Sequence, residues 1–241
     1  MEWFESWFDT PYYHLLYSNR DYTEAENFIT KLTADLQLPP NSKIIDLACG
    51  KGRHSVFLNT LGYDVLGLDL SGQSIAYDKQ FENETLSFAV HDMRNPVDAA
   101  PVDAVFNLFT SFGYFDQESD DRKVFDSVYH GLKTGGFFVL DYLNEEFVRK
   151  NMVPESKILR GDLEFYITKR IEGRHIIKDI RFEDQGKAYH FFEKVKLHTR
   201  EAINSYAEEC GFERIKIWGD YQLNEFDKEN SPRCINLFKK K

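Results

Sequence analysis

The stretch KIIDLACGKGRHS, residues 43–55, joins a short apolar run to two closely spaced glycines and a polar segment. The run at 43–48 is mostly apolar on both faces, which is typical of a strand buried in a parallel sheet. Gly50 and Gly52 allow the backbone to turn tightly and to approach a ligand without an intervening Cβ atom. A helix is predicted to follow, to about Leu61. A strand that turns through glycines into a helix begins a strand–helix–strand unit.

The same alternation of apolar runs and helical segments continues along the chain. Four further runs are predicted as strands: YDVLGLDL (63–70), LSFAV (86–90), DAVFNLF (103–109) and GGFFVLDYL (135–143). Helices are predicted after Ser71 and near 120–132. This order predicts an α/β fold, a Rossmann-like, doubly wound sheet covered by helices.

The first 40 residues are predicted to be helical. Thr23-Glu24-Ala25-Glu26 matches a capping box, and apolar residues follow it at helical spacing. Pro39-Pro40 ends that helix. We expect residues 1–40 to form an N-terminal helical cap.

Beyond Asn151 the pattern becomes that of antiparallel strands. Three stretches, 163–171, 175–183 and 187–197, alternate polar and apolar residues and are separated by Glu-Gly and Gln-Gly pairs. We predict an inserted antiparallel β subdomain at 151–197 that serves as a substrate lid.

The last part of the chain returns to the first pattern. A helix is predicted with Thr199 as its cap and Gly211 as its stop, followed by strands at 212–218 and 233–238. We therefore assign residues 1–150 and 198–241 to one domain, into which the β subdomain is inserted.

Composition narrows the classes of function. The 241 residues include 30 Lys and Arg against 40 Asp and Glu, a net charge of −10 that disfavours binding to nucleic acid. There is no run of 18 apolar residues, so no membrane-spanning helix is expected, and the N-terminus lacks the bases of a signal peptide. Cys49, Cys210 and Cys234 share no Cys-x-x-Cys spacing, which argues against a disulfide framework or a zinc site. We expect a cytoplasmic protein without a metal.

Ligands of a parallel α/β sheet bind beyond the carboxyl ends of its strands. Arg53 and His54 occupy the first turn of a predicted helix, where positive charge opposes the helix dipole. An anionic ligand explains them better than helix stability does, and solvated side chains are the alternative. Asp69 ends the second strand, 19 residues beyond Gly50, where a carboxylate can accept both hydroxyls of a ribose. Its alternative role as a helix cap is less favoured, because Ser71 fills that role.

The third and fourth strands are also followed by polar and aromatic side chains. Asp92 offers an acceptor to the amino group of an adenine, and Met93 offers a soft side chain to its ring. Asn107 follows the fourth strand beside aromatic residues. These positions predict a nucleotide-like ligand at this edge of the sheet.

Five segments, in order, resemble the motifs of class I S-adenosylmethionine-dependent methyltransferases. They are DLACGKGR, GLDLS, HDMRN, FNLFTSFGYF and LKTGGFFVLDYLN, and the resemblance covers about residues 11–147 and resumes at HTREAINSYAEECGFERI. The inserted meander resembles that of small-molecule methyltransferases of the glycine N-methyltransferase-like kind. The resemblance implies a seven-stranded sheet, the cofactor S-adenosylmethionine and the product S-adenosylhomocysteine.

The resemblance also implies which residues bind the cofactor. Asp46, Ala48, Gly50 and Gly52 line its methionine part, Arg53 complements its carboxylate, Asp69 holds the ribose, Leu70, Asp92 and Met93 hold the adenine, Asn107, Leu108 and Phe109 lie near the sulfonium, and Tyr13 closes over the cofactor. For Tyr13, core packing is the alternative. Asn107 begins Asn-Leu-Phe-Thr rather than Asn/Asp-Pro-Pro-Tyr/Phe, which disfavours methylation of nucleobases or of protein glutamine.

Methyl transfer from a sulfonium needs alignment of the reactants and exclusion of water more than it needs acid–base groups. Candidate contacts to a small-molecule substrate are Thr110, Tyr114, Tyr142, Asn144, Arg181 and His190. For the residues of the inserted sheet, a solvated face is the alternative. Two other functions share parts of the pattern: an S-adenosylmethionine-binding sensor or scaffold without catalysis, and an NAD-dependent oxidoreductase, which fits Ser55 and the HDMRN segment less well.

Overall fold

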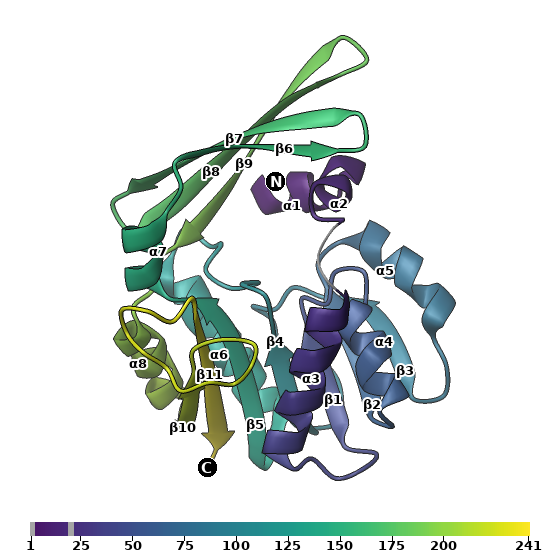
Figure 1. Ribbon diagram of the computed structural model, residues 1–241. Helices are drawn as coiled ribbons and strands as arrows, with labels where there is room; N and C mark the ends of the chain where they lie inside the picture. Colours follow the sequence, from purple (N-terminus) through teal and green to yellow (C-terminus); the bar gives the residue numbers. More distant parts are fainter. Residues whose placement is uncertain (1–2, 19–21) are drawn as a thin grey trace.

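The computed structural model describes residues 3–18 and 22–241 and contains two sheets (Figure 1). The larger sheet has seven strands in the order β10-β11-β5-β4-β1-β2-β3. Their bounds are β1 (Lys43–Leu47), β2 (Asp64–Asp69), β3 (Leu86–Val90), β4 (Val102–Asn107), β5 (Leu132–Leu143), β10 (Phe212–Trp218) and β11 (Arg233–Lys240). The first five pair in parallel, whereas β11 is antiparallel to β5 and to β10. The Rossmann-like α/β prediction and its seven strands are therefore confirmed.

Helices cover both faces of this sheet. They are α3 (Tyr22–Leu36), α4 (Arg53–Thr60), α5 (Gly72–Asp78), α6 (Glu118–Gly131) and α8 (Arg200–Cys210). The 3₁₀ helix η1 (Lys79–Phe81) follows α5, and helix α7 (Glu145–Asn151) follows β5. Phe28 of α3, Leu58 of α4 and Ile75 of α5 belong to one buried apolar cluster. Phe125 of α6 and Tyr206 of α8 belong to a second cluster. Two cores, one on each face, thus hold the strand ends in fixed positions.

The predicted helix caps can be compared with the structure one by one. The Thr199 hydroxyl accepts a hydrogen bond from the Ala202 amide at 3.0 Å, and Gly211 ends α8 with φ 97°, as predicted. The Ser71 hydroxyl caps α5 by accepting from the Ser74 amide. The prediction for Thr23 is wrong, because α3 begins at Tyr22 and Thr23 lies inside its first turn.

The smaller sheet is antiparallel, with the order β6-β7-β8-β9. Its strands are β6 (Glu155–Arg160), β7 (Leu163–Glu172), β8 (His175–Asp184) and β9 (Lys187–Lys196). The three predicted strands are present. The fourth, β6, was not predicted, because its ESKILR sequence has only two apolar residues, which are adjacent and do not alternate with polar ones.

The N-terminal 40 residues do not act as a single cap. Helices α1 (Trp3–Phe8) and α2 (Pro11–Leu16) pack on the smaller sheet, where Trp7 and Leu16 join Phe165 and Phe182 in a third apolar cluster. Helix α3 instead covers the larger sheet. Figure 1 shows α1 and α2 between the smaller sheet and the carboxyl ends of the parallel strands. Among the described residues, no helix has the length and apolar character needed to cross a membrane.

Candidate functional site

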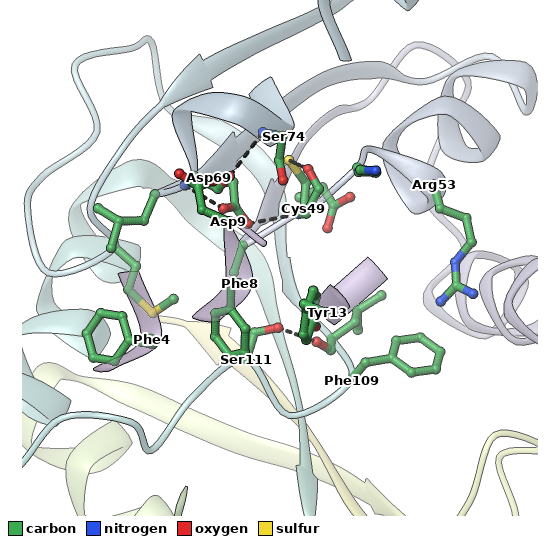
Figure 2. Close-up of a pocket in the computed structure, with 18 of the residues that line it drawn as sticks. Phe4, Phe8, Asp9, Tyr13, Cys49, Arg53, Asp69, Ser74, Phe109 and Ser111 are labelled. Carbon is green, nitrogen blue, oxygen red and sulfur yellow. Dashed lines mark hydrogen bonds between the residues drawn. The ribbon is translucent and has the colours of Figure 1, made fainter. Parts of the chain in front are cut away.

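A cavity of about 720 Å³ lies where the parallel strands end (Figure 2). Its wall consists of Ala48, Cys49, Gly50 and Lys51 after β1, Asp69, Leu70 and Ser71 after β2, His91, Asp92 and Met93 after β3, and Leu108, Phe109, Ser111, Tyr114 and Phe115 after β4, with Asp46, Arg53, His54, Ser74 and Tyr77. Phe4, Phe8, Asp9, Tyr13, His14, Tyr17 and Ser18 line it from the N-terminal segment. The cavity therefore opens between the sheet edge and the α1–α2 segment.

The glycine-containing loop after β1 has an unusual backbone. Ala48, Gly50 and Gly52 all have positive φ, between 58° and 65°. A Cβ atom at Gly50 would meet no protein atom within 4 Å and would enter open space. A Cβ at Gly52 would lie 2.8 Å from the Phe88 ring and 3.1 Å from Asp78 Cγ. Gly50 thus leaves room beside the cavity, whereas Gly52 is required for packing beneath the loop.

Asp69 connects this loop to the end of β2. Its two carboxylate oxygens accept hydrogen bonds from the amides of Gly50 and Ser71, each at 2.8 Å. Burial raises the pKa of Asp69 above its usual range, although these two hydrogen bonds act in the opposite direction. The carboxylate faces the cavity, as predicted from its place at the strand end, and it retains lone pairs for a ligand.

Asp46 lies deeper, at 1% exposure, and also reaches the cavity. The Ser55 hydroxyl donates to its carboxylate at 2.6 Å. Burial raises the pKa of Asp46 to about 6, with a further contribution from the charge of Asp69. Ser55 occupies the position where a dinucleotide fingerprint has its third small residue, and here it orients a carboxylate.

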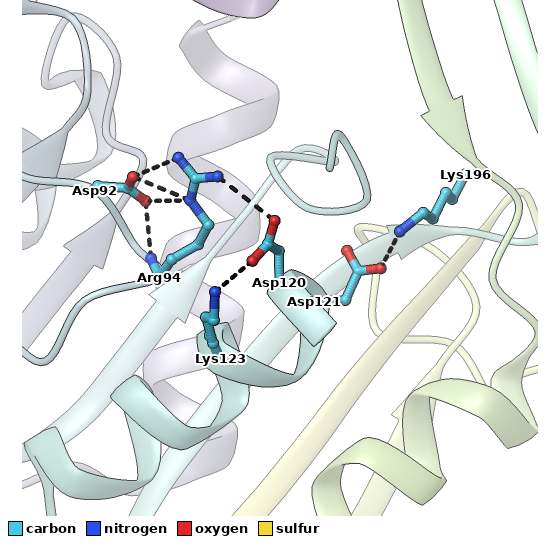
Figure 3. A network of polar contacts seen from close by, with 6 residues as sticks. All are labelled: Asp92, Arg94, Asp120, Asp121, Lys123 and Lys196. Atoms are coloured by element: carbon cyan, nitrogen blue, oxygen red, sulfur yellow. Dashed lines mark hydrogen bonds and ion pairs between the residues drawn. The ribbon is translucent and has the colours of Figure 1, made fainter. Parts of the chain in front are cut away.

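At the far end of the cavity, Asp92 is held by Arg94. The Arg94 guanidinium donates to both Asp92 oxygens, at 2.6 to 3.0 Å (Figure 3). Burial by itself would raise the pKa of Asp92, but the hydrogen bonds from Arg94 outweigh it and lower the pKa. Asp92 is therefore an ionised acceptor in a fixed orientation next to Met93.

At the opposite end, Phe109 lies among cationic and aromatic groups. Its ring stacks on His54 with 4.8 Å between centroids and 10° between planes. The Arg53 guanidinium carbon is 5.2 Å from the centre of the same ring. Arg53 Nη2 lies 3.1 Å from His54 Nε2. Because a guanidinium only donates, Nε2 is the acceptor and the proton of a neutral His54 is on Nδ1.

Residues 38–204, more than half of the chain, match a family model described as a methyltransferase domain. The chain belongs to this methyltransferase family. Its motifs and its sheet make it a class I enzyme that uses S-adenosylmethionine as its cofactor. The two alternatives, a non-catalytic binding protein and an NAD-dependent oxidoreductase, are not supported.

The methyltransferase is similar to several proteins that are themselves named as methyltransferases. It is 29% identical over 215 residues to the putative methyltransferase YqeM of Bacillus subtilis, covering 85% of each chain. It is 29% identical over 212 residues to a glycine/sarcosine N-methyltransferase of Parasynechococcus marenigrum, covering 82% of this chain and 71% of that one. A solved structure of an S-adenosylmethionine-dependent methyltransferase from Clostridium acetobutylicum has the same fold, with TM-score 0.79, 20% identity, and coverage of 95% and 96% of the two chains.

Three residues that the motifs assigned to the cofactor or substrate lie outside the cavity. Gly52 is the N-cap residue of α4 and packs against Phe88. Asn107 is fully buried, and its amide donates to the Leu47 carbonyl at 3.0 Å, which ties β4 to β1. The Thr110 hydroxyl accepts from Arg233 at 2.8 Å. All three support the loops that line the cavity.

Two predicted substrate contacts at the end of β5 are also displaced from the cavity. The Tyr142 side chain is fully buried, and its hydroxyl donates to the Lys196 carbonyl. The Asn144 side chain caps α7 and donates to the carbonyls of Lys228 and Ser231, both at 2.8 Å. Their position at the end of β5 had predicted that both line the cavity. Instead, Tyr142 packs against the smaller sheet and Asn144 packs against the C-terminal loop.

The two candidates on the smaller sheet face away from the N-terminal helices. Phe182 and Phe191 point toward α1 and α2, where they join the third apolar cluster. Since neighbouring residues of a strand point to opposite faces, Arg181 and His190 lie on the outer face. His190 hydrogen-bonds to Asp179 at 2.6 Å. Neither residue lines the cavity.

Several lining residues were not predicted. Phe4, Phe8, Asp9, His14, Tyr17 and Ser18 come from the N-terminal segment, from which only Tyr13 was assigned. Asp9 shares a hydrogen bond with the Ser71 hydroxyl, which brings a further carboxylate near Asp69. The many aromatic residues of this segment are a sequence signal that it lines a site. Which residues they contact is known only from the packing of α1 and α2. Among the described residues, no cluster of His, Cys, Asp and Glu is arranged to hold a metal.

Proposed function

We propose that this methyltransferase transfers a methyl group to the nitrogen of a small amine. The observation that carries the proposal is a cavity lined by carboxylates and by aromatic rings and covered by α1 and α2. A covered cavity favours a small acceptor over a macromolecule. The glycine/sarcosine N-methyltransferase relatives favour an amine, since their names specify nitrogen in a small molecule.

The residues present fit the cofactor along the cavity wall. Asp69 would accept the ribose hydroxyls, and Asp92 with Met93 and Leu70 would hold the adenine. Asp46, Ala48 and Gly50 would line the methionine part, and Arg53 would pair with its carboxylate. Tyr13 would cover the cofactor. When bound, S-adenosylmethionine supplies a methyl group on a positively charged sulfur, and this sulfur is a leaving group that needs no acid catalysis.

The acceptor would lie among Tyr13, Leu108, Phe109 and Tyr114, at the end of the cavity near Arg53. These side chains exclude water and hold the amine in line with the methyl group, which is the main requirement of such a displacement. Tyr114 is itself fixed, because its hydroxyl donates to the Thr110 carbonyl. We further propose that the smaller sheet, together with α1 and α2, acts as a lid over the acceptor.

Calorimetric titration with S-adenosylmethionine, S-adenosylhomocysteine and NAD tests the cofactor site. The two sulfur nucleosides are expected to bind and NAD is not. Mass spectrometry of reactions with glycine, sarcosine and glucosamine, each with and without enzyme, then tests the acceptor. An N-methylated product supports the proposal. Transfer confined to oxygen or carbon acceptors, or to proteins or nucleic acids, would contradict it.

A further inference from the structure

Two consecutive residues after β4 have a strained backbone. Phe109 and Thr110 have φ values of 58° and 62°, in the left-handed region that L-residues with bulky side chains seldom adopt. Such a conformation is strained and persists only where the surroundings of the residue enforce it. Phe109 lines the cavity, so the strain is located at the functional site.

Asp141, near the end of β5, enforces this conformation from below. Its side chain is fully buried, and its Oδ2 accepts a hydrogen bond from the Phe109 amide at 2.7 Å. Its backbone carbonyl accepts from the Thr110 amide at 3.1 Å. Both amides of the strained pair are thus satisfied by one residue.

Asp141 is in turn held by residues from the C-terminal part of the chain. Arg233, at the start of β11, donates from Nε to Asp141 Oδ1 at 2.8 Å and from Nη2 to the Thr110 hydroxyl at 2.8 Å. The Tyr221 hydroxyl donates to Asp141 Oδ2 at 3.2 Å. We call Asp141, Arg233, Thr110 and Tyr221 the Asp141 cluster. Neither Asp141 nor Arg233 lines the cavity, so the cluster is a support behind its wall.

The consequence of this support is the place of the Phe109 ring. The ring lies between Tyr221, 4.9 Å away, and His54, 4.8 Å away, and it carries the Arg53 guanidinium 5.2 Å from its centre. Figure 2 shows Arg53 and Phe109 on the same side of the cavity. A loop released from Asp141 would relax toward negative φ and move the ring away from Arg53 and His54.

We propose that Asp141 and Arg233 are positioning residues that act through Phe109 on Arg53. They hold the ring on which the guanidinium rests, and thereby set Arg53 for the carboxylate of the cofactor's methionine part. This inference rests on the proposed function, which gives Arg53 that ligand.

Two ligands separate this role from a general loss of structure. S-adenosylhomocysteine carries the amino-acid carboxylate, whereas 5′-methylthioadenosine has the same adenosine and sulfur without it. Calorimetry with Arg53→Gln, Asp141→Asn and the double variant is expected to show about tenfold weaker binding of S-adenosylhomocysteine in each. Binding of 5′-methylthioadenosine should change less than about twofold. The double variant should be no weaker than Arg53→Gln alone, because both changes remove the same contact.

Controls make each outcome decisive. Asp103 lies at the start of β4, at the end of the sheet opposite the cavity, and its carboxylate pairs with Lys133. Asp103→Asn should therefore change the affinity for neither S-adenosylhomocysteine nor 5′-methylthioadenosine. Tyr221→Phe removes one donor to Asp141 and keeps the ring, and it replaces Asp141→Asn if that variant does not fold. Tyr221→Phe is expected to bind S-adenosylhomocysteine two- to threefold more weakly and to bind 5′-methylthioadenosine as the wild type does.

Additive losses in the double variant, equal losses for both ligands, or no selective loss in either cluster variant would overturn the inference. A normal S-adenosylhomocysteine affinity in Arg53→Gln would instead refute the proposed contact of Arg53 itself. The two failures are therefore distinguishable.

Discussion

At the scale of single residues, the buried carboxyl of Asp78 makes stability depend on pH. Its side chain has 0% exposure, lies beneath Gly52, and has no hydrogen-bond partner for either oxygen within the described part of the chain. Burial, together with the charges of Asp69 and Asp46, raises its pKa from 3.8 to about 7. A raised pKa in the folded state means that the protonated form is favoured there.

The stabilising effect of that proton is complete below pH 4 and is lost as pH rises through 7. Asp78→Asn keeps the shape and cannot ionise, so its free energy of unfolding should exceed that of the wild type by about 1–3 kcal/mol at pH 8. The gap should close toward pH 4. Urea unfolding across this range measures it, and Asp64→Asn, a half-exposed carboxylate, is the control. A gap that does not vary with pH would disprove the assignment.

Asp69 gives a second prediction at the same scale. Asp69→Ala removes the acceptor for both ribose hydroxyls and should weaken S-adenosylhomocysteine binding by about 2–3 kcal/mol while the fold persists. Because 5′-methylthioadenosine also has the ribose, its binding to Asp69→Ala should weaken by the same amount, whereas its binding to Arg53→Gln should hardly change. Calorimetry and circular dichroism provide the measurements. Asp64→Ala, at the other end of β2, is the matched control. An unchanged affinity in a folded variant would place the ribose elsewhere.

At the scale of elements, Glu193 of β9 fastens the N-terminal helices to the smaller sheet. Its Oε1 accepts from Trp7 Nε1 at 2.9 Å and from the Tyr17 hydroxyl at 2.6 Å. Lys178 Nζ lies 3.4 Å from its Oε2. Since Tyr17 lines the cavity, this carboxylate joins the proposed lid to the cavity wall.

Glu193→Ala should therefore loosen α1 and α2 without unfolding the larger sheet. Hydrogen exchange of peptides from residues 3–16 should speed up, and S-adenosylhomocysteine should dissociate about three- to tenfold faster in stopped flow. Glu183→Ala, at an exposed position of β8, serves as the control. If exchange accelerates but dissociation does not, the helices do not gate the cavity.

At the scale of the whole molecule, a buried ion pair links the two sheets. Lys196, at the end of β9, pairs with Asp121 of α6, and their side chains are 8% and 0% exposed (Figure 3). The Lys196 amide also donates to the Gly113 carbonyl at 2.8 Å. The smaller sheet is thus linked to the helices of the larger sheet by an ion pair that is buried from solvent.

Asp121→Ala leaves the Lys196 ammonium buried without its carboxylate and should cost about 3–5 kcal/mol of unfolding free energy. The neighbouring Asp120→Ala breaks more exposed pairs with Lys123 and Arg94 and should cost at most about 1 kcal/mol. Denaturant unfolding of both variants gives the comparison. Similar losses in the two would show that the buried pair contributes nothing special to the link.

The sequence by itself determined the features that depend on local pattern. Apolar runs and helical periodicity identified the seven strands of the larger sheet and its helices α3, α4, α5, α6 and α8, but not α7 or η1. The place of Asp69 at the end of β2 followed from the predicted strands. Gly50 was recognisable because glycine favours a tight backbone turn, and the structure gives it a positive φ. The smaller sheet was identified except for β6, whose polar sequence becomes a strand through pairing with β7.

The tertiary structure alone decided which side chains meet in the cavity. Arg181 and His190 face outward because Phe182 and Phe191 bury the alternate face, and a strand pattern does not specify which face a distant element covers. Asp141 has the strand-end position of a ligand-binding residue, yet Arg233 and Tyr221 reach it from far along the chain and make it a support. Such contacts join residues remote in sequence, so periodicity and spacing carry no signal of them.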